Sequence, residues 1–362
     1  MKKEKFSEYK GALKHLAFKA NQSLGRRFNY NDTSILSICA INDPFYKDES
    51  KIQGGKAYRR LARRTQVFSP SLHPNVRNRL IHTNEVLVCS SEIATILGLN
   101  VKLTEAIALG HDIGHAPFGH LGERVMQDLS GKNFTHNIMS VVVAQKVERS
   151  GKGLNLTYET LEGILNHSRG SSEMNIQSNI SQEATLVMYS DKIAYTFSDL
   201  NDAIKIGFLK EKHLPKIVKY FGANQRERMA NVQFNLIMES VTEGKVSFHK
   251  TECAVMFAEL KKWMYENVYF ALDKQFYRTN LYNELGKIYD FIEKRFHGEI
   301  DPYLAIACMT DDEVIHLLKD MKRPNRQRFN YGFTEILKHF SGKKIDIFDA
   351  DLHKEDFSRK NL

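Results

Sequence analysis

The sequence contains little cysteine and no apolar run long enough to cross a membrane. Four cysteines are scattered through 362 residues without a CxxC pair, which argues against a disulfide framework or a zinc knuckle. The longest apolar stretches fall far short of the roughly 20 residues that a membrane-spanning helix needs. Near the N-terminus, charged and apolar residues are interleaved, so we expect no signal peptide, no membrane partner and a cytoplasmic location.

The sequence also lacks three motifs that identify other classes of protein. It contains no GxxxxGKS/T phosphate loop, no GxGxxG after a strand and no GxSxG nucleophile elbow. Basic residues, in contrast, are in excess, with a net charge of +9 and a pI of about 9.1. A positive excess of this size favours anionic partners, either nucleotides or nucleic acid.

The scarcity of proline, seven residues in all, and the repeated helical spacing of apolar residues predict an all-α fold. We expect helices over 78–96, from Glu105 to about Ile113 with Thr104 as its cap, over 157–167, and from Ser181 to near Gly207. Further helices are expected over 225–243, 252–273, 279–296, 311–321 and 331–340, with irregular structure over 40–56 and 168–181.

No internal repeat or clear linker divides the chain, so we expect one domain with a helical C-terminal extension. The expected parts are an N-terminal helical or loop segment (1–56), a core that carries the motifs below (57–210), a helical C-terminal part of the same domain (211–341) and a polar tail (342–362).

The segment LGHDIGHAPFGHLGE, from Leu109 to Glu123, concentrates histidine and carboxylate side chains. These groups suit a divalent metal and the water that it activates. The candidate metal ligands are His82, His111, Asp112 and Asp191. Two imidazoles and two carboxylates leave positions open for water and phosphate, which favours Mn²⁺, Fe²⁺, Co²⁺, Ni²⁺ or Mg²⁺ over a closed zinc site.

Each of these residues also has an ordinary structural interpretation. Taken alone, His82 is typical of a hydrogen-bonded core histidine, and Asp191 of an ion-pair partner in an apolar helix. Adjacent histidine and aspartate residues are common, and in a helix they diverge by about 100°. The joint pattern, with a histidine before the pair and a helical aspartate about eighty residues after it, favours the metal site.

Acid–base and anion-binding candidates accompany the proposed metal ligands. His115 lies four residues after His111, on the same face if the helix continues, and Glu123 lies three residues after His120 and can support its imidazolium. His136 is a further acid–base candidate. Arg79 and Lys192 suit phosphate, whereas Tyr195 and Asp199, spaced to share a face with Asp191, suit sugar hydroxyls.

These stretches resemble the HD-domain superfamily, and more closely its deoxyguanosinetriphosphate triphosphohydrolase-like branch. The resemblance rests on AYRRLARRTQVF (57–68), RLIHTNEV (79–86), ALGHDIGHAPFGHLGE (108–123), FTHN (134–137), LEGILNH (161–167) and YSDKIAYTFSDLNDAIKIG (189–207). It implies an all-helical fold and hydrolysis of a deoxynucleoside triphosphate to deoxynucleoside and inorganic triphosphate, in nucleotide-pool control or defence against phage.

The resemblance also implies residue roles. His82, His111, Asp112 and Asp191 match metal ligands, His120 and Glu123 match the catalytic pair, and His115 and His136 match residues near the phosphates. Gln66, Arg79, Lys192, Tyr195 and Asp199 match positions that bind phosphate, sugar or the adjoining nucleoside. The implied partners are deoxynucleoside triphosphates, an allosteric nucleotide, single-stranded DNA and further copies of the chain in a hexamer or tetramer.

Two alternatives remain open from the sequence. One is another HD phosphohydrolase, either a 5′-nucleotidase or a cyclic-nucleotide phosphodiesterase, although a minimal HD site does not need the set His115, His120 and Glu123. The other is a nucleotide-binding or nucleic-acid-binding protein with a vestigial HD site, which the net charge of +9 allows.

Overall fold

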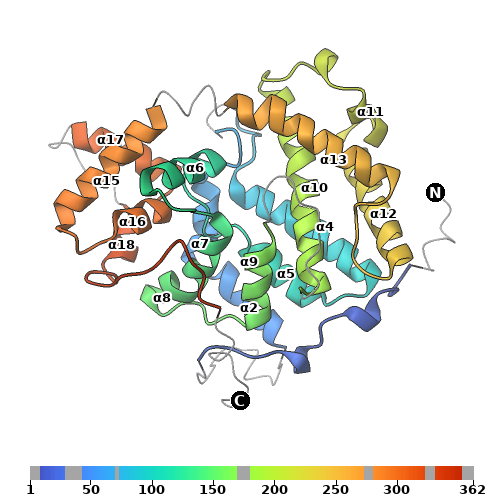
Figure 1. Ribbon diagram of the computed structural model, residues 1–362, viewed down its shortest axis with the longest axis horizontal. Coiled ribbons are helices and arrows are strands. Elements are labelled where there is room, and N and C mark those ends of the chain that lie inside the picture. The colour runs from blue at the N-terminus through green and yellow to red at the C-terminus, as the bar shows by residue number, and fades with distance from the viewer. Residues whose placement is uncertain are drawn as a thin grey trace.

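The computed structural model describes residues 9–28, 43–69, 73–168, 180–272, 280–322 and 331–352, and these residues form an all-α fold (Figure 1). The expected fold class is confirmed, because two isolated bridges, Arg26–Thr157 and Thr65–Asn78, are the only β pairings within those ranges. Among the described residues, no helix combines the length and apolar character that a membrane span requires.

The helices are named in chain order, as in Figure 1. They are α2 (Pro44–Gln53), α3 (Lys56–Arg60), α4 (Arg79–Leu97), α5 (Val101–Gly110), α6 (Gly119–Ser130), α7 (His136–Val142), α8 (Glu148–Gly151), α9 (Tyr158–Asn166), α10 (Gln182–Lys205), α11 (Ile217–Phe221), α12 (Gln225–Glu243), α13 (Glu252–Met264), α15 (Tyr282–Phe296), α16 (Pro302–Cys308), α17 (Asp311–Lys322) and α18 (Gly332–Leu337). Short 3₁₀ turns lie at Lys14–Leu16, Ala20–Gln22, Leu61–Arg63 and Glu211–His213, and π-helical segments at Val143–Val147 and Tyr265–Tyr269.

Helices α4, α5 and α10 form the centre of the molecule, and a side-chain cap fixes where each of them begins. Asn78 accepts a hydrogen bond from the Ile81 N–H at the start of α4, and Ser181 accepts one from the Ala184 N–H at the start of α10. The long interior of α10 is almost wholly buried, which places its few charged residues inside the protein. Both starts agree with the sequence-based expectation.

Two expectations about local structure are wrong. Helix α5 begins after Asn100, whose side chain caps the Leu103 N–H, and it ends at Gly110, so Thr104 lies within it. The stretch 40–56 contains helix α2 at 44–53, which Asp43 caps and Pro44 opens. Most of the other segment expected to be irregular, 169–179, lies outside the described residues.

The buried apolar residues fall mainly into two large clusters. In Figure 1, α10 to α13 lie on one side of the molecule and α15 to α18 on the other. The buried guanidinium of Arg64 donates hydrogen bonds to the carbonyls of Ile113, Ala307 and Met309, and thereby ties the two halves of the chain together. This contact supports the proposal that 211–341 belongs to the same domain as 57–210.

Gly114 allows α7 to pack directly on the segment that carries His111 and Asp112. An added Cβ at Gly114 would lie 2.1 Å from the Ser140 backbone nitrogen and 2.2 Å from the Met139 carbonyl carbon. The Gly114 N–H donates to Ser140 Oγ at 2.9 Å, and that hydroxyl donates to the His111 carbonyl at 2.8 Å. The absence of a side chain therefore sets the distance between the two segments.

We expect Gly114→Ala to lower the free energy of unfolding, because the added methyl group would collide with backbone atoms, which cannot move aside as a flexible side chain can. Overpacking a core typically costs about 1–3 kcal/mol, and we expect at least this loss. Differential scanning calorimetry measures the change as a lower Tm. The matched control is Gly286→Ala in α15, where an added Cβ meets only Leu129 at 3.8 Å and the gain in helix propensity is up to about 1 kcal/mol. An unchanged Tm for Gly114→Ala contradicts the packing argument.

Candidate metal centre and active site

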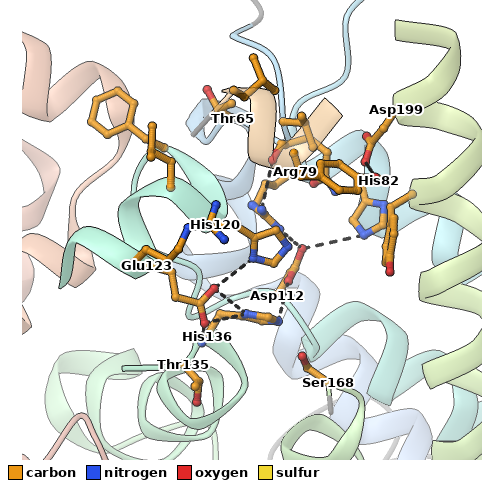
Figure 2. A pocket seen from close by; sticks show the side chains of 18 of the residues that line it. Thr65, Arg79, His82, Asp112, His120, Glu123, Thr135, His136, Ser168 and Asp199 are labelled. Atoms are coloured by element: carbon orange, nitrogen blue, oxygen red, sulfur yellow. Dashed lines mark hydrogen bonds and ion pairs between the residues drawn. The ribbon is translucent and has the colours of Figure 1, made fainter. Parts of the chain in front are cut away.

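A cavity of about 930 Å³ lies between the two halves of the molecule, with walls from α4, α7, α10 and the π-helical segment 265–269 (Figure 2). Most of the site residues expected from the sequence line it, namely Gln66, Arg79, His82, Asp112, His120, Glu123, His136, Asp191, Lys192, Tyr195 and Asp199. The other two, His111 and His115, are fully buried beside them. The structure thus gathers residues that are more than 130 positions apart in the sequence around one cavity.

The first cluster at the cavity consists of His82, His111 and Asp112, whose candidate ligand atoms lie within 4.8 Å of one another. Asp112 Oδ2 lies 3.5 Å from His111 Nε2 and 4.0 Å from His82 Nε2. Asp191 joins from α10, with Oδ1 at 3.0 Å from His82 Nε2 and 3.9 Å from His111 Nε2. Because α5 ends at Gly110, the adjacent pair lies beyond the helix end and both side chains can face one point.

The His111 ring is oriented as a metal ligand requires. Its Nδ1 donates to the Ala108 carbonyl at 2.6 Å, because a carbonyl can only accept. Its Nε2 therefore carries a lone pair, and it has no hydrogen-bond partner among the described residues. A buried imidazole lone pair without a partner, close to two carboxylates, fits a divalent cation.

The surroundings of Asp112, Asp191 and His111 favour the ionisation states that bind metal, whereas Asp191 and Asp112 raise the pKa of His82 despite burial. Burial raises the pKa of Asp112, but the Arg79 guanidinium, 2.6 Å from Oδ2, and nearby histidines outweigh it and hold that pKa well below its usual value. Burial also raises the pKa of Asp191, but the hydrogen bond from His82 and the charges of His82, His111 and His167 together outweigh it and lower that pKa. Burial lowers the pKa of His111, which keeps the ring neutral. Two carboxylates and one neutral imidazole are the deprotonated forms that coordinate cations.

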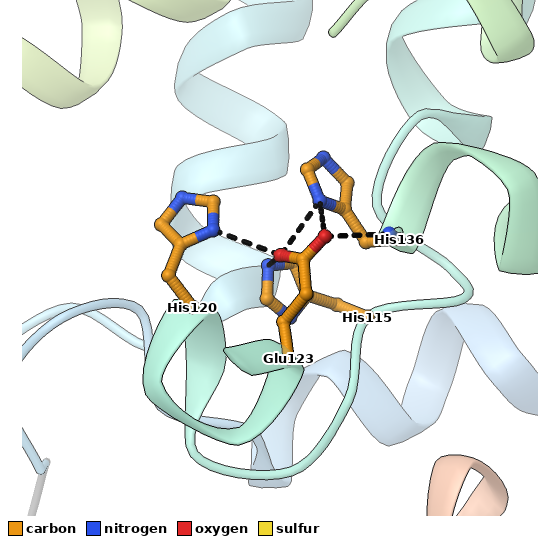
Figure 3. A group of neighbouring side chains, drawn as sticks. All are labelled: His115, His120, Glu123 and His136. Atoms are coloured by element: carbon orange, nitrogen blue, oxygen red, sulfur yellow. Dashed lines mark hydrogen bonds and ion pairs between the residues drawn. The ribbon is translucent and has the colours of Figure 1, made fainter. Parts of the chain in front are cut away.

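The second cluster is centred on the Glu123 carboxylate (Figure 3). Its oxygens lie 3.1 Å from His120 Nδ1, 3.2 and 3.3 Å from His136 Nδ1, and 4.0 Å from His115 Nε2, and Oε1 accepts the His136 backbone N–H at 3.0 Å. The His115 and His136 rings stack with centroids 4.6 Å apart. His115 reaches this position through the turn after α5, because the helix does not continue as far as His115.

The members of this cluster differ in charge and exposure. Burial raises the pKa of Glu123, but the combined effect of His136 and His120 is larger and opposite. The net pKa lies well below its usual value, so the carboxylate is ionised. In return, Glu123 raises the pKa of His136 despite burial, whereas burial and the Arg79 charge hold the pKa of His115 well below its usual value. His120 is the most exposed member of the cluster, with 48% of its side chain exposed. A reacting group in the cavity can therefore reach His120 directly.

A tight turn positions His120 at the start of α6. Phe118 has φ 63° and Gly119 has φ 65°, two successive left-handed residues, and such a conformation is costly for a bulky residue. Asp311 stabilises the turn from α17, because its Oδ1 accepts the Phe118 N–H at 2.8 Å and its Oδ2 accepts the Thr65 N–H at 2.8 Å. A Cβ at position 119 would lie 2.8 Å from the Gln66 carbonyl oxygen, so this position needs glycine.

Helix α10 supplies the opposite wall, where Asp191, Lys192, Tyr195 and Asp199 all line the cavity. The spacing predicted a shared face for Asp191, Tyr195 and Asp199. The Tyr269 hydroxyl donates to Asp199 Oδ2 at 2.8 Å. Burial raises the pKa of Asp199 to about 7. Arg79, expected to suit phosphate, contacts Asp112 and donates to the Gln66 carbonyl at 3.2 Å.

The sequence did not single out every group that the structure brings to this region. His167 at the end of α9 lies with its Nε2 3.1 Å from His136 Nε2, and burial lowers its pKa to about 3. Tyr265 and Tyr269 line the cavity from the π-helical segment. Burial lowers the pKa of Lys261 to about 8, and Asp191 opposes that shift. Only His167 had a sequence signal, since it ends the matched stretch LEGILNH.

Comparison with known proteins identifies similar sequences. The family model for the HD domain matches residues 79–196. A deoxyguanosinetriphosphate triphosphohydrolase-like protein of Clostridium perfringens (strain SM101) is 39% identical over 294 residues, which cover 75% of this chain and 84% of the relative. Proteins with the same description match in Clostridium tetani (39% over 256 residues, 69% and 72%) and, as protein 1, in Deinococcus radiodurans (42% over 178 residues, 47% and 48%).

We expect Asp191→Ala to weaken binding of Mn²⁺ by more than about 100-fold, because it removes a carboxylate that faces both His82 and His111. Losing a residue that only orients a metal ligand already costs about 10–100-fold. Isothermal titration calorimetry with Mn²⁺ measures this affinity. The control is Asp128→Ala, which removes an exposed carboxylate from α6. Equal affinities of the two variants contradict a metal role for Asp191.

Proposed function

Because this chain belongs to the deoxyguanosinetriphosphate triphosphohydrolase-like family of HD-domain proteins, we propose that it hydrolyses deoxynucleoside triphosphates to deoxynucleosides and inorganic triphosphate. The observation that carries the proposal is the presence of two clusters at one cavity. One offers His82, His111, Asp112 and Asp191 to a divalent metal, and the other presents His120 on an ionised Glu123. A minimal HD site needs the first cluster, but not the set His115, His120 and Glu123.

The donor set of the first cluster fits Mn²⁺, Fe²⁺, Co²⁺, Ni²⁺ or Mg²⁺, since it combines neutral imidazole with ionised carboxylates. A bound ion supplies Lewis-acid polarisation of a phosphate oxygen and a water of lowered pKa. Arg79 holds Asp112 ionised and adds positive charge near the phosphates. Lys192 adds a second cation on the wall formed by α10.

His120 acts as the general acid in this proposal. Glu123 accepts a hydrogen bond from Nδ1, so that the imidazolium is stabilised and Nε2 can donate its proton to the departing 5′-oxygen. His136 stabilises the same carboxylate and, with neutral His115, contacts the phosphates. Tyr195, Asp199 and Gln66 bind the sugar and the adjoining nucleoside from the cavity walls.

Further parts of the proposal concern partners. A second nucleotide acts as an activator, the chain assembles into a hexamer or tetramer, and single-stranded DNA binds to its basic surface. The net charge of +9 supports the last of these. The biological role proposed is control of the nucleotide pool, including defence against phage.

Product analysis tests the reaction. The Mn²⁺-loaded protein is incubated with each of the four deoxynucleoside triphosphates and with GTP, singly and as mixtures, and the products are separated by ion-exchange chromatography. We expect deoxynucleoside and intact triphosphate. Nucleoside monophosphate or orthophosphate would instead identify another HD phosphohydrolase, and no turnover in any mixture would favour a binding role.

Removal of the acid tests the role of His120. We expect His120→Ala to lower kcat by about 10²–10⁴-fold, the usual contribution of a positioned acid, with unchanged binding of Mn²⁺ because His120 lies outside the metal cluster. His213→Ala, at an exposed histidine in the 3₁₀ turn 211–213, serves as the control. Loss of metal together with activity would refute this assignment.

A further inference from the structure

The C-terminal segment 341–352 packs against the loop 131–135, which connects α6 to α7. The segment contains only turns and bends, and in Figure 1 it is the dark red stretch that passes α7. The half-buried Phe348 ring contacts the Phe134 ring edge to face, with centroids 6.3 Å apart. The Lys132 ammonium lies 4.8 Å from the centroid of the Phe348 ring, within the range of a cation–π contact. Phe348 therefore contacts the loop at two of its five residues.

Contacts at both ends and one buried side chain hold this segment in place. At its start, Ser341 Oγ donates a hydrogen bond to Glu299 Oε2 at 2.8 Å. At its end, Arg27 Nη2 donates to the Asp351 carbonyl at 3.3 Å and to its carboxylate at 3.1 Å. Between these contacts, Ile347 is fully buried in one of the two large core clusters. The position of the segment is therefore fixed relative to the rest of the fold.

The other side of the loop faces the cavity. Two loop residues and the first residue of α7 line it, namely Asn133, Thr135 and His136. Phe134 lies among them in the sequence but is fully buried, and its ring contacts Phe348. Among the described residues that line the cavity, none belongs to the segment 341–352. The segment therefore reaches the site only through the loop, and Phe134 is the point of contact.

The position of His136 determines how the Glu123 carboxylate is held. The His136 backbone N–H donates to Glu123 Oε1 at 3.0 Å, and the His136 Nδ1 lies 3.2 Å from Oε2. The same Oε2 lies 3.1 Å from His120 Nδ1. Because hydrogen bonds depend strongly on distance and angle, a displacement of the chain just before His136 also changes the contact between Glu123 and His120.

We propose that Phe348 is a positioning residue for the acid–base cluster. Its contact with Phe134 keeps the loop against the cavity. His136 then holds the Glu123 carboxylate in place beside His120. Removal of the Phe348 ring leaves a space into which the surrounding side chains relax in part, and Phe134 is the nearest loop residue to do so. The inference rests on the proposed function, since it takes His120 as the acid.

Steady-state kinetics of the full-length, Mn²⁺-loaded protein test this role with the deoxynucleoside triphosphate that is cleaved fastest in the product analysis. We expect Phe348→Ala to lower kcat by about 10–100-fold, the cost of displacing a catalytic group by up to about 1 Å. KM and the affinity for Mn²⁺ stay unchanged, because the metal ligands lie on α4, on α10 and after α5, not on the loop. Phe348→Tyr, which keeps the ring, retains the wild-type kcat.

Phe18→Ala is the matched control. Phe18 is also half-buried and makes an edge-to-face contact with a fully buried ring, that of Phe45, at 5.9 Å. Neither residue lines the cavity. We expect Phe18→Ala to lower Tm as Phe348→Ala does, but to leave kcat unchanged. A kcat for Phe348→Ala that falls no further than that for Phe18→Ala overturns the proposal, and so does a failure of Phe348→Tyr to restore kcat.

Hydrogen–deuterium exchange gives a readout that depends neither on turnover nor on whether Phe348→Ala folds. Phe348→Leu keeps an apolar side chain but loses the ring contacts, so we expect the amides of 131–136 to lose protection, whereas those of 182–205 keep it. Unchanged protection of 131–136 overturns the proposal. Failure of the proposed function is distinguishable, because a wild-type protein that cleaves no deoxynucleoside triphosphate still shows this loss of protection in Phe348→Leu.

Discussion

The buried carboxylate of Asp112 is the charge around which the site is organised. An isolated ionised carboxylate away from water is very unfavourable, so the fold has to surround it with partners. Those partners come from separate elements: Arg79 and His82 from α4, His111 from the end of α5, and His136 from α7. Because each of these side chains faces one of the two Asp112 oxygens, a shift of any one element changes the environment of the whole cluster.

A second carboxylate, Glu123, organises the acid–base groups in a similar way, but with a different balance of burial. His115 and His136 are enclosed, whereas His120 remains half exposed at the cavity. Their surroundings shift the pKa values of the two enclosed rings in opposite directions, because burial and the Arg79 charge lower that of His115 whereas Glu123 raises that of His136. His120 alone retains the contact with solvent that a group exchanging protons during turnover requires.

Much of the fold and the site could be predicted from the sequence, and the failures have physical causes. The starts of α4, α9 and α10 follow from local caps at Asn78, Thr157 and Ser181, which depend only on neighbouring residues. Helix α2 was missed because its sequence is mostly polar, although Asp43 followed by Pro44 is a helix-start signal. His167 was given no role because its significance depends on His136 and His111, which become its neighbours only in the folded chain. The membership in the HD-domain family was predicted correctly, because it rests on contiguous motifs.

The hydrogen bonds that Arg64 and Asp311 make across the chain have a consequence for how this protein can diversify. The HD segment 79–196 contains most of the proposed site residues, but the turn before His120 is held from outside it by Asp311 in α17, and Arg64 is held by the carbonyls of residues 307 and 309. The segment is therefore not a portable module. Recombination that exchanged it between proteins without the matching C-terminal helices would separate the acid from its support, so the two parts have to be inherited together.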